Sequence, residues 1–172
     1  MDNIQYHKLG AQNMADYLRL RLKCLADHPD EFGTTYEEEL NSKSLKLEGA
    51  IHGPDEYNFV YGAFSVDKKL IGICGCKTET RLKTRHRAEI VQVYVDRQYR
   101  KRGIASELLR LTIHAAFQTP LIEQIILSAV ATNQKAMELY KSAGFVEYGR
   151  LNNYFKSENG YFKQSFLYLN KP

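Results

Sequence analysis

The segment Val91-Gln92-Val93-Tyr94-Val95-Asp96-Arg97-Gln98-Tyr99-Arg100-Lys101-Arg102-Gly103-Ile104-Ala105-Ser106 is the most informative stretch of the chain. A strand-like apolar run leads through a basic loop into a helix that begins near Gly103. The first turn of a helix has backbone N–H groups without partners and lies at the positive end of the macrodipole. Gly103 allows a ligand to approach that turn closely, and Ala105 keeps the next exposed face small. The segment therefore predicts a pyrophosphate-binding turn.

Other phosphate-binding motifs do not fit this segment. The G-x-x-x-x-G-K-S/T loop of nucleotide hydrolases is absent from the sequence. The three-glycine dinucleotide pattern is also absent, since Gly103 is the one glycine at the turn and no ribose-binding acid follows at the expected position. On local evidence alone, an ordinary helix start with solvated basic side chains explains the loop equally well.

A motif in this loop and a second motif further along the chain together resemble the signatures of one protein family. Arg100-x-x-Gly103-x-Ala105 resembles the acyl-CoA signature Gln/Arg-x-x-Gly-x-Gly/Ala of the GNAT superfamily of N-acetyltransferases. About thirty residues later, Asn133 to Phe145 is similar to that family's second hallmark, N-x-x-A-x-x-x-Y-x-x-x-G-F. The stretch from Leu18 to Gly33 resembles the opening of bacterial members. The resemblance thus extends over nearly the whole chain.

The resemblance implies an α/β fold of the α+β kind. Its mixed, mostly antiparallel central sheet has about seven strands, is splayed between strands 4 and 5, and is flanked by about four helices. Acetyl-CoA would lie as co-substrate in the gap between residues 88–95 and 125–130. The expected cofactor-binding residues are Val93, Tyr94, Val95, Arg100, Lys101, Arg102, Gly103, Ile104, Ala105, Ser106, Asn133 and Tyr140.

The resemblance also implies catalytic roles. Tyr140 matches the tyrosine that protonates the departing thiolate, and a phenol remains protonated at neutral pH; the alternative is an aromatic packing residue. The attacking amine must lose a proton, for which Glu89 on the fourth strand is the first candidate and Glu38 the second. An ion pair of Glu89 with the neighbouring Arg85–Arg87 is the competing interpretation.

We therefore expect an N-acetyltransferase. It would transfer an acetyl group from acetyl-CoA to a primary amine of a small molecule or of a protein or peptide, by direct attack in a ternary complex. One alternative is a non-catalytic acyl-CoA sensor on the same fold. Another is a nucleic-acid-binding module built on the basic clusters Arg81–Arg87 and Arg97–Arg102. Tyr99 is the one aromatic residue interleaved with these charges, so we expect no nucleic-acid partner. The Arg81–Arg87 cluster has no assigned role beyond contact with the cofactor's outer phosphate.

Periodicity and turn residues predict a single domain spanning residues 1–172. The predicted strands are Ile4–Lys8, Tyr57–Val66, Leu70–Thr80, Ala88–Val95, Ile125–Val130, Phe145–Phe155 and Tyr161–Leu169. The predicted helices run from Gln12 toward Pro29, from about Thr35 to Glu48, from Ile104 toward Pro120 and from Asn133 to Ala143, where Gly144 supplies a left-handed cap. Tyrosines of the last hairpin are assigned to sheet packing rather than to the acceptor pocket.

Composition and sequence patterns distinguish between globular, membrane-spanning, secreted and metal-binding classes of protein. The 24 Lys and Arg exceed the 20 Asp and Glu by four charges, and 44% of the residues are hydrophobic, as in a globular protein. No apolar run reaches the roughly 20 residues of a membrane span, and no secretory signal opens the sequence, so we expect a cytoplasmic protein without a membrane partner. The three cysteines lack metal-site spacing and the histidines form no close pair, so no metal is expected. Antiparallel sheet edges are compatible with a homodimer.

Overall fold

A computed structural model describes residues 3–172; residues 1 and 2 of the predicted domain lie outside this range. Seven strands form one sheet in the order β1-β2-β3-β4-β5-β7-β6. All neighbouring strands are antiparallel except β4 and β5, which are parallel. The strands are β1 (Gln5–Lys8), β2 (Phe59–Phe64), β3 (Leu70–Thr78), β4 (Arg87–Val95), β5 (Gln124–Val130), β6 (Val146–Ser157) and β7 (Gly160–Asn170). The expected seven-stranded mixed sheet is confirmed.

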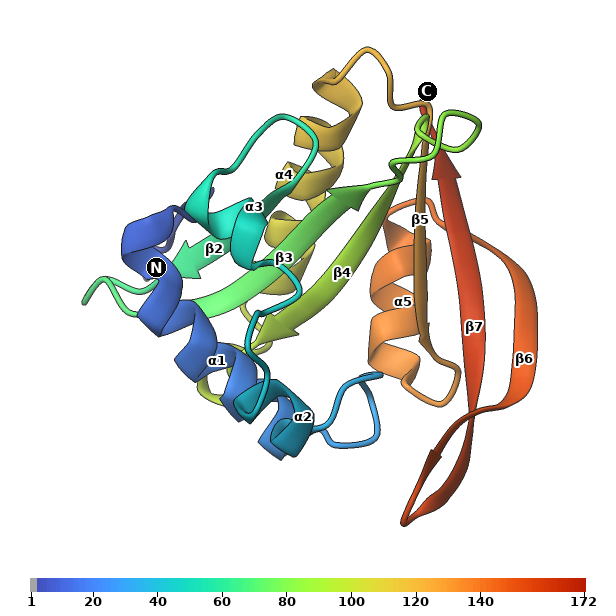
Figure 1. Ribbon diagram of the computed structural model, residues 1–172, viewed down its shortest axis with the longest axis horizontal. Helices are drawn as coiled ribbons and strands as arrows, with labels where there is room; N and C mark the ends of the chain where they lie inside the picture. Colours follow the sequence, from blue (N-terminus) through green and yellow to red (C-terminus); the bar gives the residue numbers. More distant parts are fainter. Residues whose placement is uncertain (1–2) are drawn as a thin grey trace.

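Helices cover both faces of the sheet, and each face has its own apolar cluster (Figure 1). On one face α4 and α5 pack against the sheet through side chains such as Leu108 and Met137. On the other face α1 and α3 pack through Leu20 and Ile51. The helices are α1 (Met14–Asp27), α2 (Tyr36–Leu40), α3 (Glu48–His52), α4 (Ile104–Gln118) and α5 (Gln134–Ser142), with 3-10 turns at Ala11–Asn13 and Arg97–Tyr99.

The sheet opens between β4 and β5. Within the described range the two strands pair only from Arg87 to Glu89, opposite Gln124 to Ile126. From Ile90 to Val95, β4 has no strand partner on its β5 side among residues 3–172. Figure 1 shows the strands diverging at this point, with α5 beside the gap. This is the splay that the sequence resemblance implied.

A bulge in β4 lies at the wide part of this gap. The pairing of β4 with β3 shifts register between Ile73 and Gly75, opposite Val91 to Tyr94. Gln92 in this bulge has a φ of 56°, which is a left-handed conformation that few non-glycine residues adopt. The hydroxyl of Tyr17 on α1 donates a 2.7 Å hydrogen bond to Oε1 of Gln92. This bond holds the bulge against α1.

The prediction of one helix from Thr35 to Glu48 is wrong. The structure has two five-residue helices, α2 and α3, with a turn between them, which raises the number of α-helices from about four to five. The Asn41 side chain donates to the carbonyl of Glu37, and Ser42 Oγ bonds to the carbonyl of Ser44. Side chains of this kind compete with helical backbone bonds, and three of them in four residues end the helix.

The other element boundaries differ from prediction by a few residues. The first helix starts at Met14 after a 3-10 turn rather than at Gln12, and β2 spans Phe59–Phe64. The cap at Gly144 is confirmed, with a φ of 94°, and so is the C-terminal hairpin that turns at Glu158 and Asn159. In the described part of the chain, no helix is both long and apolar enough to cross a membrane.

Candidate active site

A cavity of about 460 Å³ occupies the gap beside β4. Its walls come from the end of β4, the basic loop and first turn of α4, and the first turns of α5. The cofactor-binding residues predicted from the sequence that line it are Val93, Tyr94, Val95, Arg100, Lys101, Gly103, Ile104, Ala105, Ser106, Asn133 and Tyr140. Arg102 is the one predicted residue outside this lining; its guanidinium lies 5.6 Å from the centre of the Tyr99 ring.

The start of α4 suits a pyrophosphate. Gly103 is its N-cap with a φ of 75°, and within the described residues no side chain caps the helix. A Cβ added at Gly103 would meet no atom of residues 3–172 within 4 Å, so the space over this turn is open. Uncapped N–H groups at the positive end of a helix, beside Arg100 and Lys101, are the kind of groups that bind anions. These residues fit the diphosphate of acetyl-CoA.

Arg100 also belongs to a hydrogen-bonded chain across the mouth of the cavity. Its Nε donates to the carbonyl of Val95 at 2.9 Å, and Nη2 lies 2.7 Å from Nε2 of His28. A guanidinium can only donate, so Nε2 of His28 accepts and the ring proton is on Nδ1. Nδ1 lies 3.3 Å from Oε1 of Glu31. Asn133 Nδ2 donates to Oε2 of Glu31 at 2.9 Å. The chain fixes the Glu31 carboxylate between the basic loop and α5.

Tyr140 projects from α5 into the interior and is 7% exposed. Its ring packs edge-on against Phe145, 6.1 Å between centres. Burial raises the pKa of Tyr140 well above that of a free phenol, and the charges of Cys74 and Glu31 raise it further. The hydroxyl is therefore protonated at neutral pH and able to donate. Glu31 and Tyr140 both line this cavity.

A second cavity of about 330 Å³ adjoins the first on the α1 side of the sheet. It lies between β4, the loop that follows α1, and the β6–β7 hairpin. The residues that line both cavities are Glu31, Phe32, Val93, Asn133, Ala136 and Tyr140. Glu31 and Tyr140 thus stand where the two cavities join. One cavity can hold a thioester while the other holds an attacking group.

The loop after α1 is tied to the tip of the β6–β7 hairpin, which closes the second cavity at one end. Asp30 accepts hydrogen bonds from Ser157 Oγ at 2.8 Å and from Asn159 Nδ2 at 2.7 Å. The backbone of Gly33 approaches Phe155 so closely that an added Cβ would lie 2.9 Å from the ring. A side chain at position 33 would therefore require the Phe155 ring to shift.

The two carboxylates predicted as bases are placed differently. Glu89 lines the second cavity but not the first, and its carboxylate lies 2.6 Å from Nζ of Lys77 on β3. Glu89 is therefore in an ion pair, but its partner is Lys77 of the adjacent strand and not the Arg85–Arg87 segment named from the sequence. Glu38 belongs to a capping box with Thr35 at the start of α2 and lines neither cavity. Glu31 has the position at the junction.

A buried ion pair forms part of the second cavity wall. Arg21 of α1 lies 3.3 Å from Glu39 of α2, and both side chains are almost fully buried. The guanidinium also lies 5.2 Å from the centre of the Phe32 ring. Arg21, Glu31 and Gln92 were not among the site residues predicted from the sequence. Arg21 could have been recognised as a charged residue on the apolar face of a predicted helix. No pattern in the sequence marked Glu31 or Gln92.

The two basic clusters lie apart. Arg81–Arg87 forms the β3–β4 loop, which lies beside the C-terminus in Figure 1. β4 extends for roughly 26 Å between this loop and the α4 turn, at 3.3 Å per residue. The cluster is therefore too distant to meet a phosphate at α4.

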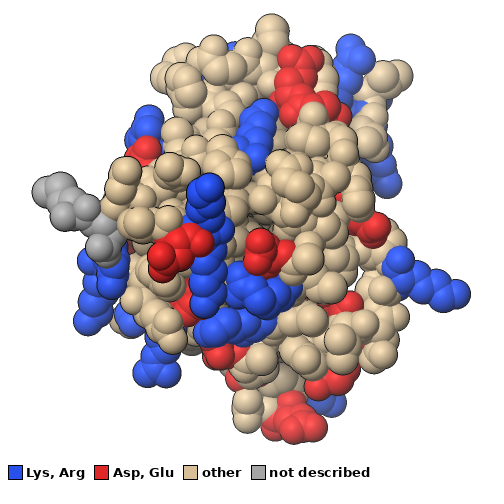
Figure 2. All heavy atoms as spheres, turned by 90° about the vertical axis from the view of Figure 1, so that its left-hand side faces the viewer, with Lys and Arg blue, Asp and Glu red and all other residues tan. Residues whose placement is uncertain are grey.

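Figure 2 shows that basic and acidic side chains lie side by side on the α1 face of the molecule. One ion pair of α1 joins Lys23 and Asp27 at 2.9 Å.

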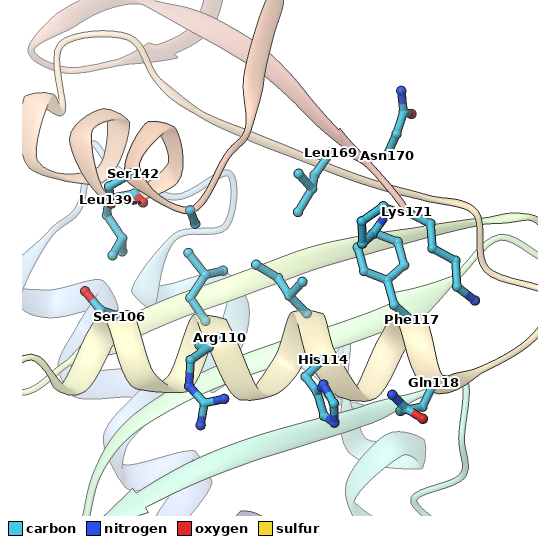
Figure 3. Close-up of a pocket in the computed structure, with 14 residues that line it drawn as sticks. Ser106, Arg110, His114, Phe117, Gln118, Leu139, Ser142, Leu169, Asn170 and Lys171 are labelled. Carbon is cyan, nitrogen blue, oxygen red and sulfur yellow. Dashed lines mark hydrogen bonds between the residues drawn. The ribbon is translucent and has the colours of Figure 1, made fainter.

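A larger cavity of about 710 Å³ lies between α4, α5 and the end of β7 (Figure 3). Phe117 extends toward Leu169 there, whereas Arg110 and His114 point away from them (Figure 3). Arg110 is paired with Glu107 at 2.6 Å. The wall between the helices is apolar and holds no paired acid and base, so size alone does not identify the reacting centre. No cluster of metal-binding side chains occurs among residues 3–172.

Comparison with known proteins gives one family. Residues 20–145, more than half of the chain, match the acetyltransferase (GNAT) family. N-alpha-acetyltransferase 30 of Xenopus laevis is 31% identical over 90 residues, which are 52% of this chain and 33% of that protein. N-alpha-acetyltransferase MAK3 of Arabidopsis thaliana is 33% identical over 100 residues, 58% of this chain and 52% of that protein. The chain therefore spans between a third and about half of these relatives.

Solved structures match over nearly the whole chain. A GNAT-family acetyltransferase from Streptococcus pneumoniae superposes with a TM-score of 0.80 at 19% identity, covering 98% of this chain and 100% of that one. Arabidopsis thaliana NAA60 in complex with a bisubstrate analogue has a TM-score of 0.72 at 20% identity and covers 98% of both chains. At these identities the structures establish a shared fold.

Proposed function

The chain belongs to the acetyltransferase (GNAT) family of acetyl-CoA-dependent acyltransferases, and on that basis we propose that it acetylates the α-amino group of a peptide or protein N-terminus. The observation that carries the proposal is the junction of two cavities at Glu31 and Tyr140. One side offers an uncapped helix start for a diphosphate, and the other a separate compartment for an amine. The relatives that match in sequence are named N-alpha-acetyltransferases, which favours an α-amine over other amines.

The residues around the first cavity would bind acetyl-CoA. Uncapped N–H groups of the α4 turn and the side chains of Arg100 and Lys101 would hold the diphosphate. The open side of β4 near Val93 would pair with the pantetheine, because strand groups there lack a β5 partner within the described range. A backbone N–H at this point would stabilise the negative charge that develops on the acetyl oxygen.

Glu31 and Tyr140 would transfer the protons. The amine nitrogen forms a bond to the acetyl carbon, and the carbon–sulfur bond of the thioester breaks. Glu31 would take the proton that the amine loses, directly or through one water, and Tyr140 would give its hydroxyl proton to the departing thiolate. Glu89 remains the alternative base, but its pairing with Lys77 holds its carboxylate away from the junction. Direct attack of this kind requires both substrates to be bound together.

The experiment is a free-thiol release assay with acetyl-CoA and a panel of short peptides, lysine-containing peptides with blocked N-termini, polyamines and aminoglycosides. Mass spectrometry of each product locates the acetyl group. We expect thiol release with free N-terminal peptides and acetylation at the α-nitrogen. Acetylation of blocked peptides on lysine, or of the small amines in preference, would contradict the proposal. Acetyl-CoA binding without thiol release from any amine would indicate a sensor.

A further inference from the structure

The second cavity contains three buried side chains whose hydrogen-bonding capacity is not used up. Arg21, Gln92 and Gln164 all line it, and they are 3%, 9% and 5% exposed. Arg21 Nη1, Gln92 Nε2 and Gln164 Oε1 have no hydrogen-bond partner in the described part of the chain. A buried polar group that loses its water without gaining a partner destabilises the protein. Three such atoms around one cavity indicate that a bound molecule satisfies them.

Neighbouring bonds decide whether each amide can donate or accept. Tyr17 donates its hydroxyl proton to Oε1 of Gln92 at 2.7 Å, which leaves the NH2 group of Gln92 as the unused donor. Gln164 donates through Nε2 to Ser128 Oγ at 3.0 Å, which leaves its Oε1 as the unused acceptor. Arg21 can only donate, and Glu39 already holds its Nε. The cavity therefore offers two donors and one acceptor.

These groups lie on opposite walls. Tyr17 and Arg21 are one turn apart on α1, and the Tyr17 bond connects Gln92 to the same wall. Gln164 is on β7, opposite Val130 of β5, across the gap between β4 and β5. A ligand between the walls therefore meets donors on one side and an acceptor on the other. A peptide unit has this arrangement, because its C=O and N–H point in opposite directions.

We propose that this cavity binds the first peptide unit of the acceptor, with its C=O held by Arg21 and Gln92 and its N–H held by Gln164. The inference rests on the proposed function and deepens it, since it states which atoms next to the α-amine are recognised. A free amine without an adjoining amide would leave the three buried groups unpaired. The enzyme would then distinguish an N-terminus from other amines by the peptide bond that follows it.

The substrates for the test are three alanine derivatives that share an α-amine beside a carbonyl. Alanine N-methylamide has both C=O and N–H, whereas alanine N,N-dimethylamide and alanine methyl ester lack the N–H. We expect kcat/KM for the N-methylamide to exceed that of the other two by roughly tenfold, mainly through KM. Equal kcat/KM for all three would overturn the inference while leaving N-terminal acetylation intact. No acetylation of these compounds or of any peptide would overturn the proposed function itself.

Two variants test which side chain binds the C=O and which binds the N–H of the substrate. Gln164→Met removes the acceptor and should abolish the preference for the N-methylamide, so that kcat/KM for the N-methylamide falls to that for the dimethylamide. Gln92→Glu removes the donor but keeps Oε1 for Tyr17, and should raise KM for all three compounds by roughly tenfold. In both variants the Kd for acetyl-CoA and the melting temperature serve as controls for the fold. A Gln164→Met enzyme that still prefers the N-methylamide would contradict the assignment.

Discussion

Tyr17 of α1 and Gln92 of β4 are 75 residues apart in the chain and are joined by a 2.7 Å hydrogen bond. The bond connects the helix that covers one face of the sheet to the bulge at which β4 separates from β5. Burial raises the pKa of Tyr17 to about 12, so the hydroxyl keeps its proton and donates at every physiological pH. Because the hydroxyl donates to Oε1 of Gln92, the NH2 group is the end of the amide that faces away from α1. One contact therefore fixes both the strand and a polar group of the acceptor cavity.

Replacement of Tyr140 tests the proton donor. Tyr140→Phe keeps the ring that packs against Phe145 and removes the hydroxyl. We expect kcat to fall by about 10²-fold or more, the contribution of a general acid, with the Kd for acetyl-CoA unchanged. Thiol release and calorimetry measure the two quantities. Tyr148→Phe, on an exposed tyrosine of β6, is the matched control and should have wild-type kcat. Wild-type turnover in Tyr140→Phe would remove the assignment.

A second pair of variants separates the two candidate bases. Glu31→Gln keeps the size of the side chain between His28 and Asn133, but it removes the proton acceptor and replaces one of the two oxygens that accept hydrogen bonds from these residues. We expect kcat to fall by about 10²-fold and the rise of the rate with pH to change. Glu89→Gln should have a smaller effect, because its carboxylate is paired with Lys77. Full pH–rate profiles of both variants decide between them. The reverse order of effects would make Glu89 the base.

Gly103 tests the diphosphate site. Gly103→Ala places a methyl group in the open space over the first turn of α4 and forces alanine into a φ of 75°. The strain costs about 1 kcal/mol of stability. The Kd for CoA should rise by roughly fivefold or more, which corresponds to about 1 kcal/mol. The affinity for pantetheine, which lacks the diphosphate, should not change. Gly149→Ala on β6, which also has open space, is the control; equal losses for both ligands would refute a local effect.

Variants of the buried Arg21–Glu39 pair distinguish its contribution to stability from the contribution of Arg21 to substrate binding. Glu39→Met leaves the buried guanidinium without its partner and should lower the free energy of unfolding by about 3 kcal/mol. The double variant Arg21→Met/Glu39→Met should regain most of that loss, because apolar pairs pack well at buried sites. Urea denaturation measures both. KM for the alanine N-methylamide should nevertheless stay raised in the double variant, and a return to the wild-type KM would exclude Arg21 from substrate binding.

The lowered pKa of Glu147 predicts that the stability of the fold depends on pH. Arg150 donates to its carboxylate through Nη2 at 2.8 Å, and this bond lowers the pKa of Glu147 to about 2. A lowered pKa in the folded state gives stability that is present above the unfolded-state pKa near 4.5. That stability is lost as the pH falls from about 4.5 toward about 2. The destabilisation caused by Glu147→Gln, measured by denaturant midpoint, should shrink across this range. Glu158→Gln in the exposed turn is the control for a glutamate substitution elsewhere on the surface.

Local sequence patterns were sufficient for most of the fold. Alternating and helical apolar spacing predicted all seven strands, and the glycines at 103 and 144 marked the start of one helix and the end of another. The helix expected from Thr35 to Glu48 was wrong because Asn41 and Ser42 bond to nearby backbone, a local competition that apolar spacing does not reveal. Eleven of the twelve cofactor-binding residues predicted from the resemblance line the cavity beside β4.

The acceptor side depended on tertiary structure. Glu31, Gln92 and Gln164 come from a loop, a bulge and the last strand, and no spacing in the chain relates them. The sequence by itself determined the family, the individual strands and the turn that suits a diphosphate, because each is recognised from the pattern of residues close in the chain. The tertiary structure decided which carboxylate stands at the junction and which polar atoms remain unpaired. Those properties depend on how distant segments pack and on which hydrogen bonds are already made, and neither is written in local pattern.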